Sequence, residues 1–270
     1  MGKSFTSADT LRDVCDNPEK LSKFLEQKSV NHTGLYQYTT LDALRGMKET
    51  GTLFFTRSDC LNDGMEFDGV EQRQQFYIAS FCAKQKESVA MWALYSTPNE
   101  KGIRIKFSTS TIIKSAKGDS NEMEVFKVGE GNNVLFKNRL ALDRIFLTDV
   151  AYLDRERNLL RWRRDTANID IENFQDELLR GQIKDSMWDY ESEVRLLIKL
   201  KGLEQDFPKR IALKVENLLD NAVILKSPGF REENYKDKLY KDLFKTISFQ
   251  KNRFYGKVTF PTCGSCRWCK

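Results

Sequence analysis

Hydrophobic and polar residues alternate in short blocks along the first half of the chain, and the period of each block predicts its structure. A polar stretch with scattered apolar positions predicts a helical lead-in over residues 9–27. Four blocks typical of strands follow, at residues 35–38, 52–56, 76–83 and 103–107. Thr40 precedes apolar residues at helical spacing and Gly51 follows them, which predicts a capped helix between the first two strands. Residues 89–95 suit a second short helix.

The second half predicts more strands than helices. Strand patterns occupy residues 145–152, 190–200, 210–215, 222–225 and 254–260. Helical segments are expected near residues 155–164 and 172–183, and over residues 232–247. Residues 108–131 are polar and carry no clear period. Because strands outnumber the regular strand–helix alternation of a doubly wound sheet, the pattern predicts an α+β fold.

Composition supports one main globular domain. The 270 residues are 40% apolar and 31% charged, which excludes a disordered or linker-rich chain. We expect a helical lead-in over residues 1–33, a single α+β domain over 34–260 and a cysteine-containing tail over 261–270. No run of 18 apolar residues occurs, and the N-terminus lacks the apolar centre of a secretory signal. A cytoplasmic protein without a membrane partner is therefore expected.

The charge balance is mildly basic. Lys and Arg exceed Asp and Glu by 44 − 39 = +5, and the densest basic run lies within residues 155–164. This run suits either a solvated face or contact with an anionic partner.

Three of the six cysteines, Cys263, Cys266 and Cys269, lie close together near the C-terminus. The Cys-x-x-Cys spacing can bring two thiolates to one zinc ion, but three cysteines are one ligand short of a tetrahedral site. Zinc is therefore disfavoured, and a redox or partner-dependent thiol cluster and an incidental tail remain open.

The residue types present exclude several kinds of active site and leave those built on carboxylates. His32 is the only histidine, and neither a phosphate-binding loop nor a dinucleotide-binding glycine motif occurs. In a strand over residues 190–200, period two places Glu191, Glu193 and Arg195 on one face. Two neighbouring carboxylates raise each other's pKa and the arginine counteracts this, so the group is either a binding site or a solvated, salt-bridged face.

Five short motifs occur in order over most of the chain. They are Leu35-Tyr36-Gln37-Tyr38; Gly51-Thr-Leu53 with Asn62-Asp63-x-x-Glu66; Ser80-Phe81; Met91-Trp92-x-x-Tyr95 with Gly102-Ile-x-Ile-x-Phe107; and Trp188-x-Tyr190-Glu191-x-Glu193-x-Arg195. The set resembles a widespread bacterial family of unknown function, found among abortive-infection and phage-defence genes. That family is similar to ADP-ribosyltransferases, which implies split mixed and antiparallel sheets with flanking helices.

The resemblance also implies roles for individual residues. Glu193 would be the catalytic carboxylate, Glu191 would position or activate the acceptor, and Ser80 would be the serine of a core strand. The first-strand arginine that grips the NAD phosphate is replaced here by Gln37. Arg57 or Arg195 would have to neutralise that phosphate instead, or the ligand is not NAD. Aromatic residues that could stack on NAD, and that equally suit a core, are Tyr36, Tyr38, Trp92 and Tyr95.

We therefore expect an NAD-consuming toxin or defence effector that modifies a macromolecular acceptor, with RNA or DNA favoured slightly over protein and with an antitoxin or inhibitor as a further partner. No metal ligand is assigned. One alternative is a metal-dependent nuclease that uses Asp63, Glu66, Glu191 and Glu193. The other is a non-enzymatic module in which the acids and arginines form only salt bridges.

Overall fold

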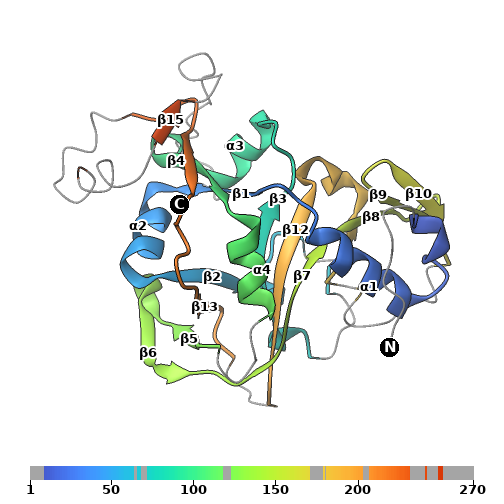
Figure 1. Cartoon of the computed structure of the whole chain (residues 1–270), viewed down its shortest axis with the longest axis horizontal. Helices are drawn as coiled ribbons and strands as arrows, with labels where there is room; N and C mark the ends of the chain where they lie inside the picture. Colours follow the sequence, from blue (N-terminus) through green and yellow to red (C-terminus); the bar gives the residue numbers. More distant parts are fainter. Residues whose placement is uncertain are drawn as a thin grey trace. The chain divides into compact units, whose positions relative to one another are not determined.

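The structure is a computed structural model, and it describes residues 9–63, 66–67, 72–117, 123–170, 179, 181–202, 207–231, 241 and 249–251 (Figure 1). The fold is mixed α+β, as the sequence predicts. The chain divides into two compact units. Unit 1 comprises Met1–His32, Leu53–Cys82 and Ile112–Lys214, and unit 2 comprises Thr33–Thr52, Ala83–Thr111 and Val215–Lys270.

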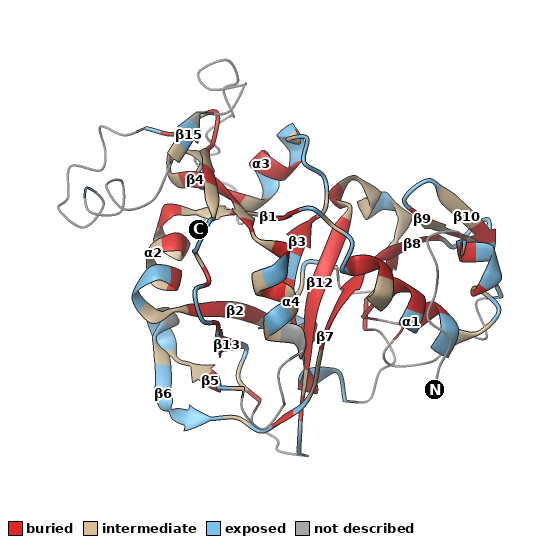
Figure 2. Ribbon diagram, viewed as in Figure 1, coloured by how far each residue is buried: buried red, intermediate tan, exposed pale blue. Residues whose placement is uncertain are grey.

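Unit 1 is built on a sheet whose most buried strand is β12 (Glu193–Leu200). This strand pairs antiparallel with β3 (Phe76–Cys82) on one side and with β7 (Leu142–Asp149) on the other. Seven of its eight residues are buried, so both of its faces are covered (Figure 2). Beyond β3 the order continues through β2 (Thr52–Arg57), β13 (Arg210–Lys214), β5 (Val125–Val128) and β6 (Val134–Arg139).

A second sheet of unit 1 has the strand order β10-β9-β8-β11. Its strands are β8 (Ala151–Asp154), β9 (Leu159–Trp162), β10 (Asp165–Asn168) and β11 (Ile183–Asp185). The N-terminal 3-10 helix η1 (Leu11–Asp13) and helix α1 (Pro18–Ser29) pack on this sheet through a core that includes Phe24, Leu160 and Trp162. The lead-in is therefore helical as predicted, and its helix starts at Pro18 with Asn17 as the N-cap.

The helix predicted near residues 155–164 is wrong. Residues 155–158 form a turn, β9 follows, and a second turn at residues 163–164 leads into β10. Asn158 and Arg163 adopt left-handed backbone conformations with φ of 50° and 55°, which tight turns accept and a helix does not. Leu160 and Trp162 are buried at a spacing of two residues, so β9 buries alternate positions against the α1 core.

Among its described residues, unit 2 contains the strand order β15-β14-β4-β1 and two complete α-helices. The strands are β1 (Leu35–Thr40), β4 (Gly102–Phe107), β14 (Val223–Lys226) and β15 (Phe249–Lys251), and the helices are α2 (Leu41–Thr50) and α3 (Val89–Tyr95). The Thr40 hydroxyl accepts a hydrogen bond from the backbone N–H of Ala43 at 3.4 Å, and Gly51 ends α2 with φ of 63°. Both capping predictions are confirmed.

The remaining predictions divide between the described and the undescribed residues. Within residues 108–131, which carry no clear period, the chain forms α4 (Thr109–Lys117), β5 and the 3-10 helix η5 (Glu130–Asn132). The helix expected over 232–247 lies almost wholly outside the described residues, and so do most of segment 172–183, strand 254–260 and the cysteine tail. No helix in the described part of the chain is long and apolar enough to cross a membrane.

Candidate functional site

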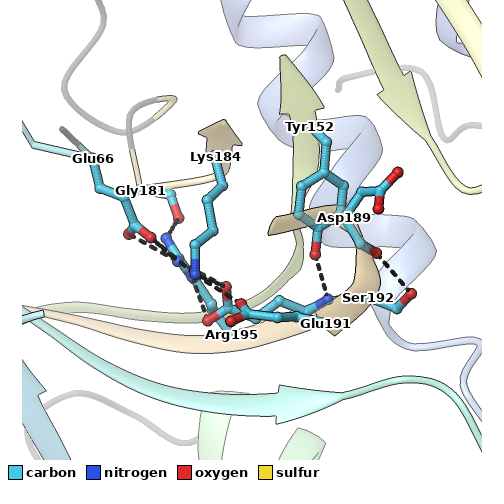
Figure 3. A network of polar contacts seen from close by, with 9 residues as sticks. Glu66, Tyr152, Gly181, Lys184, Asp189, Glu191, Ser192 and Arg195 are labelled. Carbon is cyan, nitrogen blue, oxygen red and sulfur yellow. Dashed lines mark hydrogen bonds and ion pairs between the residues drawn. The ribbon is translucent and has the colours of Figure 1, made fainter. Parts of the chain in front are cut away.

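Unit 1 brings five ionisable side chains together in its interior (Figure 3). They are Glu66, Lys184, Glu191, Glu193 and Arg195, and each is at most 8% exposed. We call this group the ionic cluster. It combines three carboxylates with two cations, so its formal charge is −3 + 2 = −1 when all five groups are ionised.

Arg195 is the most enclosed member of the ionic cluster, with 1% exposure. Its Nε lies 2.9 Å from Oε1 of Glu193 and its NH2 group lies 2.8 Å from Oε2 of the same carboxylate, so the guanidinium forms a bidentate pair. The NH2 group also lies 2.8 Å from Glu66, and NH1 donates to the carbonyl of Gly181 at 3.0 Å. Arg195 therefore links two carboxylates and one backbone carbonyl.

Lys184, on β11, contacts all three carboxylates. Its Nζ lies 2.7 Å from Glu191, 3.3 Å from Glu66 and 3.4 Å from Glu193. The ammonium also lies 4.5 Å from the centre of the Trp188 ring. Lys184 is thus one of the two cations that balance the negative charge of the three carboxylates.

The two predicted acids come from different elements rather than from one strand face. Glu191 ends the 3-10 helix η7 (Ser186–Glu191), whereas Glu193 begins β12. Between them Ser192 has φ of 46°, a left-handed conformation that interrupts the extended backbone. The prediction of a continuous strand from residue 190 is therefore wrong, although both carboxylates still meet at Lys184.

Contacts around η7 fix this break in the strand. Asp185 caps η7 by accepting a hydrogen bond from the backbone N–H of Met187 at 2.9 Å. The backbone N–H of Glu193 donates to the hydroxyl of Tyr152 at 2.7 Å, which anchors the start of β12 (Figure 3). Burial raises the pKa of Tyr152 well above its usual value, so the hydroxyl stays protonated.

Electrostatics keep Glu193 and Lys184 ionised at neutral pH. Burial alone would raise the pKa of Glu193, but the charges of Arg195 and Lys184, with hydrogen bonds from Arg195 and Ser80, lower it to about 2. Burial would lower the pKa of Lys184, but the charge of Glu193 and the other two carboxylates raises it. Glu193 is therefore a carboxylate and Lys184 an ammonium over the whole physiological range.

Ser80 connects this interior cluster with the surface. It lies on β3 directly opposite Arg195 in the antiparallel register, and its side chain is one of the causes that lower the pKa of Glu193. Ser80 is exposed, although every other residue of β3 is buried. An exposed serine therefore lies beside the buried cluster.

Arg57, one of two candidates for a phosphate contact, is held by neighbouring groups. Its guanidinium lies 2.6 Å and 3.0 Å from the carboxylate oxygens of Asp59 and also donates to the carbonyl of Phe207. The pKa of Arg57 is raised, chiefly by the hydrogen bond to Asp59. Arg195, the other candidate, belongs to the ionic cluster.

The remaining candidates belong to unit 2. Tyr36 and Tyr38 on β1 are buried, and Tyr38 makes an edge-to-face contact with the fully buried Trp92 at 4.9 Å between ring centres. Tyr95 ends α3 and is partly exposed. Gln37 has a buried side-chain oxygen that accepts no hydrogen bond from any described residue. The aromatic residues expected to stack on NAD and the acids Glu191 and Glu193 thus come from two different units.

Sequence reasoning missed Arg104 in unit 2. Arg104 alternates with the apolar residues Ile103 and Ile105, a pattern typical of a polar strand face, but its side chain is only 2% exposed. Its guanidinium lies 3.9 Å from the centre of the Tyr36 ring and donates to the carbonyls of Gln85 and Lys84. The same reasoning missed Lys184, because its link with Glu191 and Glu193 depends on how β11 and β12 are placed.

The arrangement disfavours a divalent metal at the three carboxylates. A metal ion would have to meet Glu66, Glu191 and Glu193 where the Lys184 ammonium already lies within 3.4 Å of each. Within the described ranges, no group of three or more His, Cys, Asp or Glu side chains is arranged to hold a metal ion. The three tail cysteines lie outside those ranges.

The fold and the site define an α+β protein with a buried cluster of three carboxylates and two cations beside the exposed Ser80. Residues 91–196 match the model of the family described as "Protein of unknown function (DUF2971)". That span includes most of α3, all of β4 and the cluster residues Lys184, Glu191, Glu193 and Arg195. No curated protein and no solved structure matches the chain significantly.

Proposed function

We propose that the protein is an NAD-dependent ADP-ribosyltransferase that acts as a toxin or defence effector on a macromolecular acceptor, with Glu193 as the carboxylate that meets the NAD ribose. The observation that carries this proposal is the place of the exposed Ser80, which pairs with Arg195 across the two strands and is one of the groups that lower the pKa of the buried Glu193. A serine on the strand beside the catalytic glutamate is also what the motif resemblance implies. Ser80 is therefore the point at which a ribose would reach Glu193.

The proposed chemistry needs a fixed negative charge. The bond between ribose C1′ and the nicotinamide nitrogen breaks, its electron pair leaves with neutral nicotinamide, and positive charge develops on the ribose. An acceptor nucleophile then bonds to C1′ and loses its proton. An ionised Glu193, held in one orientation by Arg195, would stabilise that charge without rearrangement during the reaction.

Glu191 and Lys184 have supporting roles in this proposal. Lys184 lies closer to Glu191 than to Glu193, at 2.7 Å and 3.4 Å. A ribose hydroxyl that hydrogen-bonds Glu193 would compete first with this longer contact. Glu191 would then hold the ammonium aside and position the acceptor. RNA or DNA remains the favoured acceptor because the chain carries a net charge of +5.

The test measures nicotinamide release and label transfer from NAD labelled on its adenylate, with a cell lysate as the source of acceptor. The parent protein is expected to be active, and Glu193→Gln is expected to lose activity at least a hundredfold. Ser80→Ala is expected to lose about tenfold without a change in fold, because Ser80 is exposed and is only one of several groups that lower the pKa of Glu193. Ser110→Ala, which removes another exposed, hydrogen-bonded serine hydroxyl, is the matched control and should keep parent activity.

Three outcomes would overturn the proposal. Equal activity of the parent and Glu193→Gln would remove Glu193 from catalysis. Cleavage of nucleic acid that stops with a chelator and needs no NAD would establish the nuclease alternative. A parent protein without activity on NAD or nucleic acid would leave the non-enzymatic module, in which these residues form only salt bridges.

A further inference from the structure

A second polar site lies in unit 1, where the tip of the β9–β10 hairpin meets the N-terminal segment. A cavity of about 690 Å³ opens there. Its cationic lining residues are Lys28, Arg163 and Arg164, its acidic lining residues are Asp9 and Asp165, and Trp162 forms part of its wall. The volume lies within the range of small-molecule sites.

The lining carries three cations and two acids, which is a formal excess of one positive charge. The carboxylate of Asp165 accepts hydrogen bonds from the backbone N–H groups of Leu11 and Thr166, at 2.5 Å and 2.9 Å. The ammonium of Lys28, which is only 8% exposed, donates to the backbone carbonyl of Asp9 at 3.3 Å. These hydrogen bonds of Asp165 and Lys28 thus go to backbone groups rather than to each other.

The two arginines at the hairpin tip differ in their partners. Arg163 lies 3.0 Å from the buried carboxylate of Asp149, which His32 also contacts at 2.6 Å, so its position is fixed. Arg164 is exposed and forms no hydrogen bond or ion pair with any residue in the described part of the chain. An arginine without a partner at the mouth of a cavity is suited to an anion, since its planar donors match phosphate oxygens.

The packing of Trp162 limits which parts of a ligand the cavity can contact besides its anionic group. Phe24 packs edge-on against its ring at 4.9 Å, the guanidinium of Arg163 lies 4.4 Å from its centre, and its Nε1 donates to Asp149 at 2.9 Å. The ring is therefore already packed and only 8% exposed. A base cannot stack on it, so recognition would rest on the anionic group alone.

We propose that this cavity binds the phosphate group of a nucleotide or of a single-stranded nucleic acid through Arg164, Arg163 and Lys28, without recognition of the base. The site does not depend on the proposed NAD chemistry. The site gives a specific role to Arg163 and Arg164, which lie at the C-terminal end of the basic run of residues 155–164.

The test uses the full chain and a fluorescein-labelled single-stranded oligonucleotide, followed by fluorescence anisotropy. Arg164→Ala is expected to weaken binding about tenfold and to reduce the slope of log K against log salt concentration by about 0.7. Arg155→Ala is the matched control, because Arg155 is an exposed arginine of the same run outside the cavity lining. Its affinity should stay within about twofold of the parent. The oligonucleotide assay contains no NAD, so its result is independent of the NAD test.

Competition identifies the source of the phosphate. Displacement of the oligonucleotide by adenosine monophosphate and by inorganic phosphate, but not by adenosine, supports a small-ligand site. Failure of all three, with the loss in Arg164→Ala retained, supports a backbone phosphate of nucleic acid. Equal losses in Arg164→Ala and Arg155→Ala, displacement by adenosine or by polyglutamate, or no binding at all would overturn the proposal. Circular dichroism confirms that the variants fold.

Discussion

Lys184→Met is the sharpest test of how the ionic cluster contributes to stability. The substitution keeps an unbranched side chain beside Trp188 and removes only the ammonium. The formal charge of the cluster then changes from −1 to −2, because three carboxylates remain with Arg195 alone. Each of these groups is buried, so solvent cannot screen the excess charge.

The magnitude follows from the ion pairs that Lys184 forms. Its ammonium lies within 3.4 Å of all three carboxylates, and it is closest to Glu191, at 2.7 Å. Removal of one member of a buried ion pair typically costs about 3–5 kcal/mol, because its partner stays buried and uncompensated. We expect Lys184→Met to lower the free energy of unfolding by that amount. Glu191→Gln should cost less than about 1 kcal/mol, because it leaves two carboxylates with two cations and retains an acceptor oxygen.

The assay is urea unfolding at neutral pH, followed by circular dichroism, for the parent, both single variants and the double variant. In the double variant Glu191→Gln should restore about 1–3 kcal/mol of the stability that Lys184→Met removes, because the charge returns from −2 to −1. A loss below about 1 kcal/mol in Lys184→Met would show that the lysine is not held by the cluster. A double variant less stable than Lys184→Met would refute the charge argument itself.

Two further predictions concern Glu193 and Arg104. The folded-state pKa of Glu193, about 2, lies below its ordinary value of 4.5, so this carboxylate adds stability above pH 4.5 that is lost as pH falls toward 2. Acid titration of the free energy of unfolding should show roughly 3 kcal/mol more loss in the parent than in Glu193→Gln, and parallel titration curves would contradict this. Arg104→Lys should cost about 2–3 kcal/mol, because lysine cannot span the Gln85 and Lys84 carbonyls while it covers Tyr36. A thermal midpoint equal to that of the control Arg155→Lys would argue against it.

Elements with local signals were predictable from the sequence. Helix α2 has a threonine that caps its first turn and a glycine in the left-handed conformation after its last, and both signals lie next to the helix in the sequence. Strands β1 and β3 and helix α3 were likewise found near their observed bounds, because apolar residues recur at their own periods. The local pattern of apolar and capping residues was sufficient to predict those elements whose own residues determine their conformation.

Elements decided by distant contacts were not predictable. Arginine-rich residues 155–162 suit a helix by propensity, yet pairing with β8 and β10 and the core around Phe24 select a strand. Arg104 is in the polar half of an alternating pattern, but two carbonyls and two tyrosine rings satisfy it in the interior. In both cases the residues that determine the structure lie elsewhere in the sequence, so the periodicity of the segment itself could not predict the outcome.

The same difference between local signals and distant contacts explains why the sequence identified Glu191 and Glu193 as a pair but predicted the wrong geometry for them. The spacing of Glu191 and Glu193 predicted one strand face, and the left-handed Ser192 removes that geometry. Their carboxylates nevertheless converge, because η7 and β12 direct them to a lysine supplied by β11. An open strand face would let water screen the two acids, whereas burial leaves one negative charge in excess beside Ser80. In the proposed reaction, a buried negative charge beside the exposed Ser80 would stabilise a cationic transition state more strongly than solvated carboxylates would.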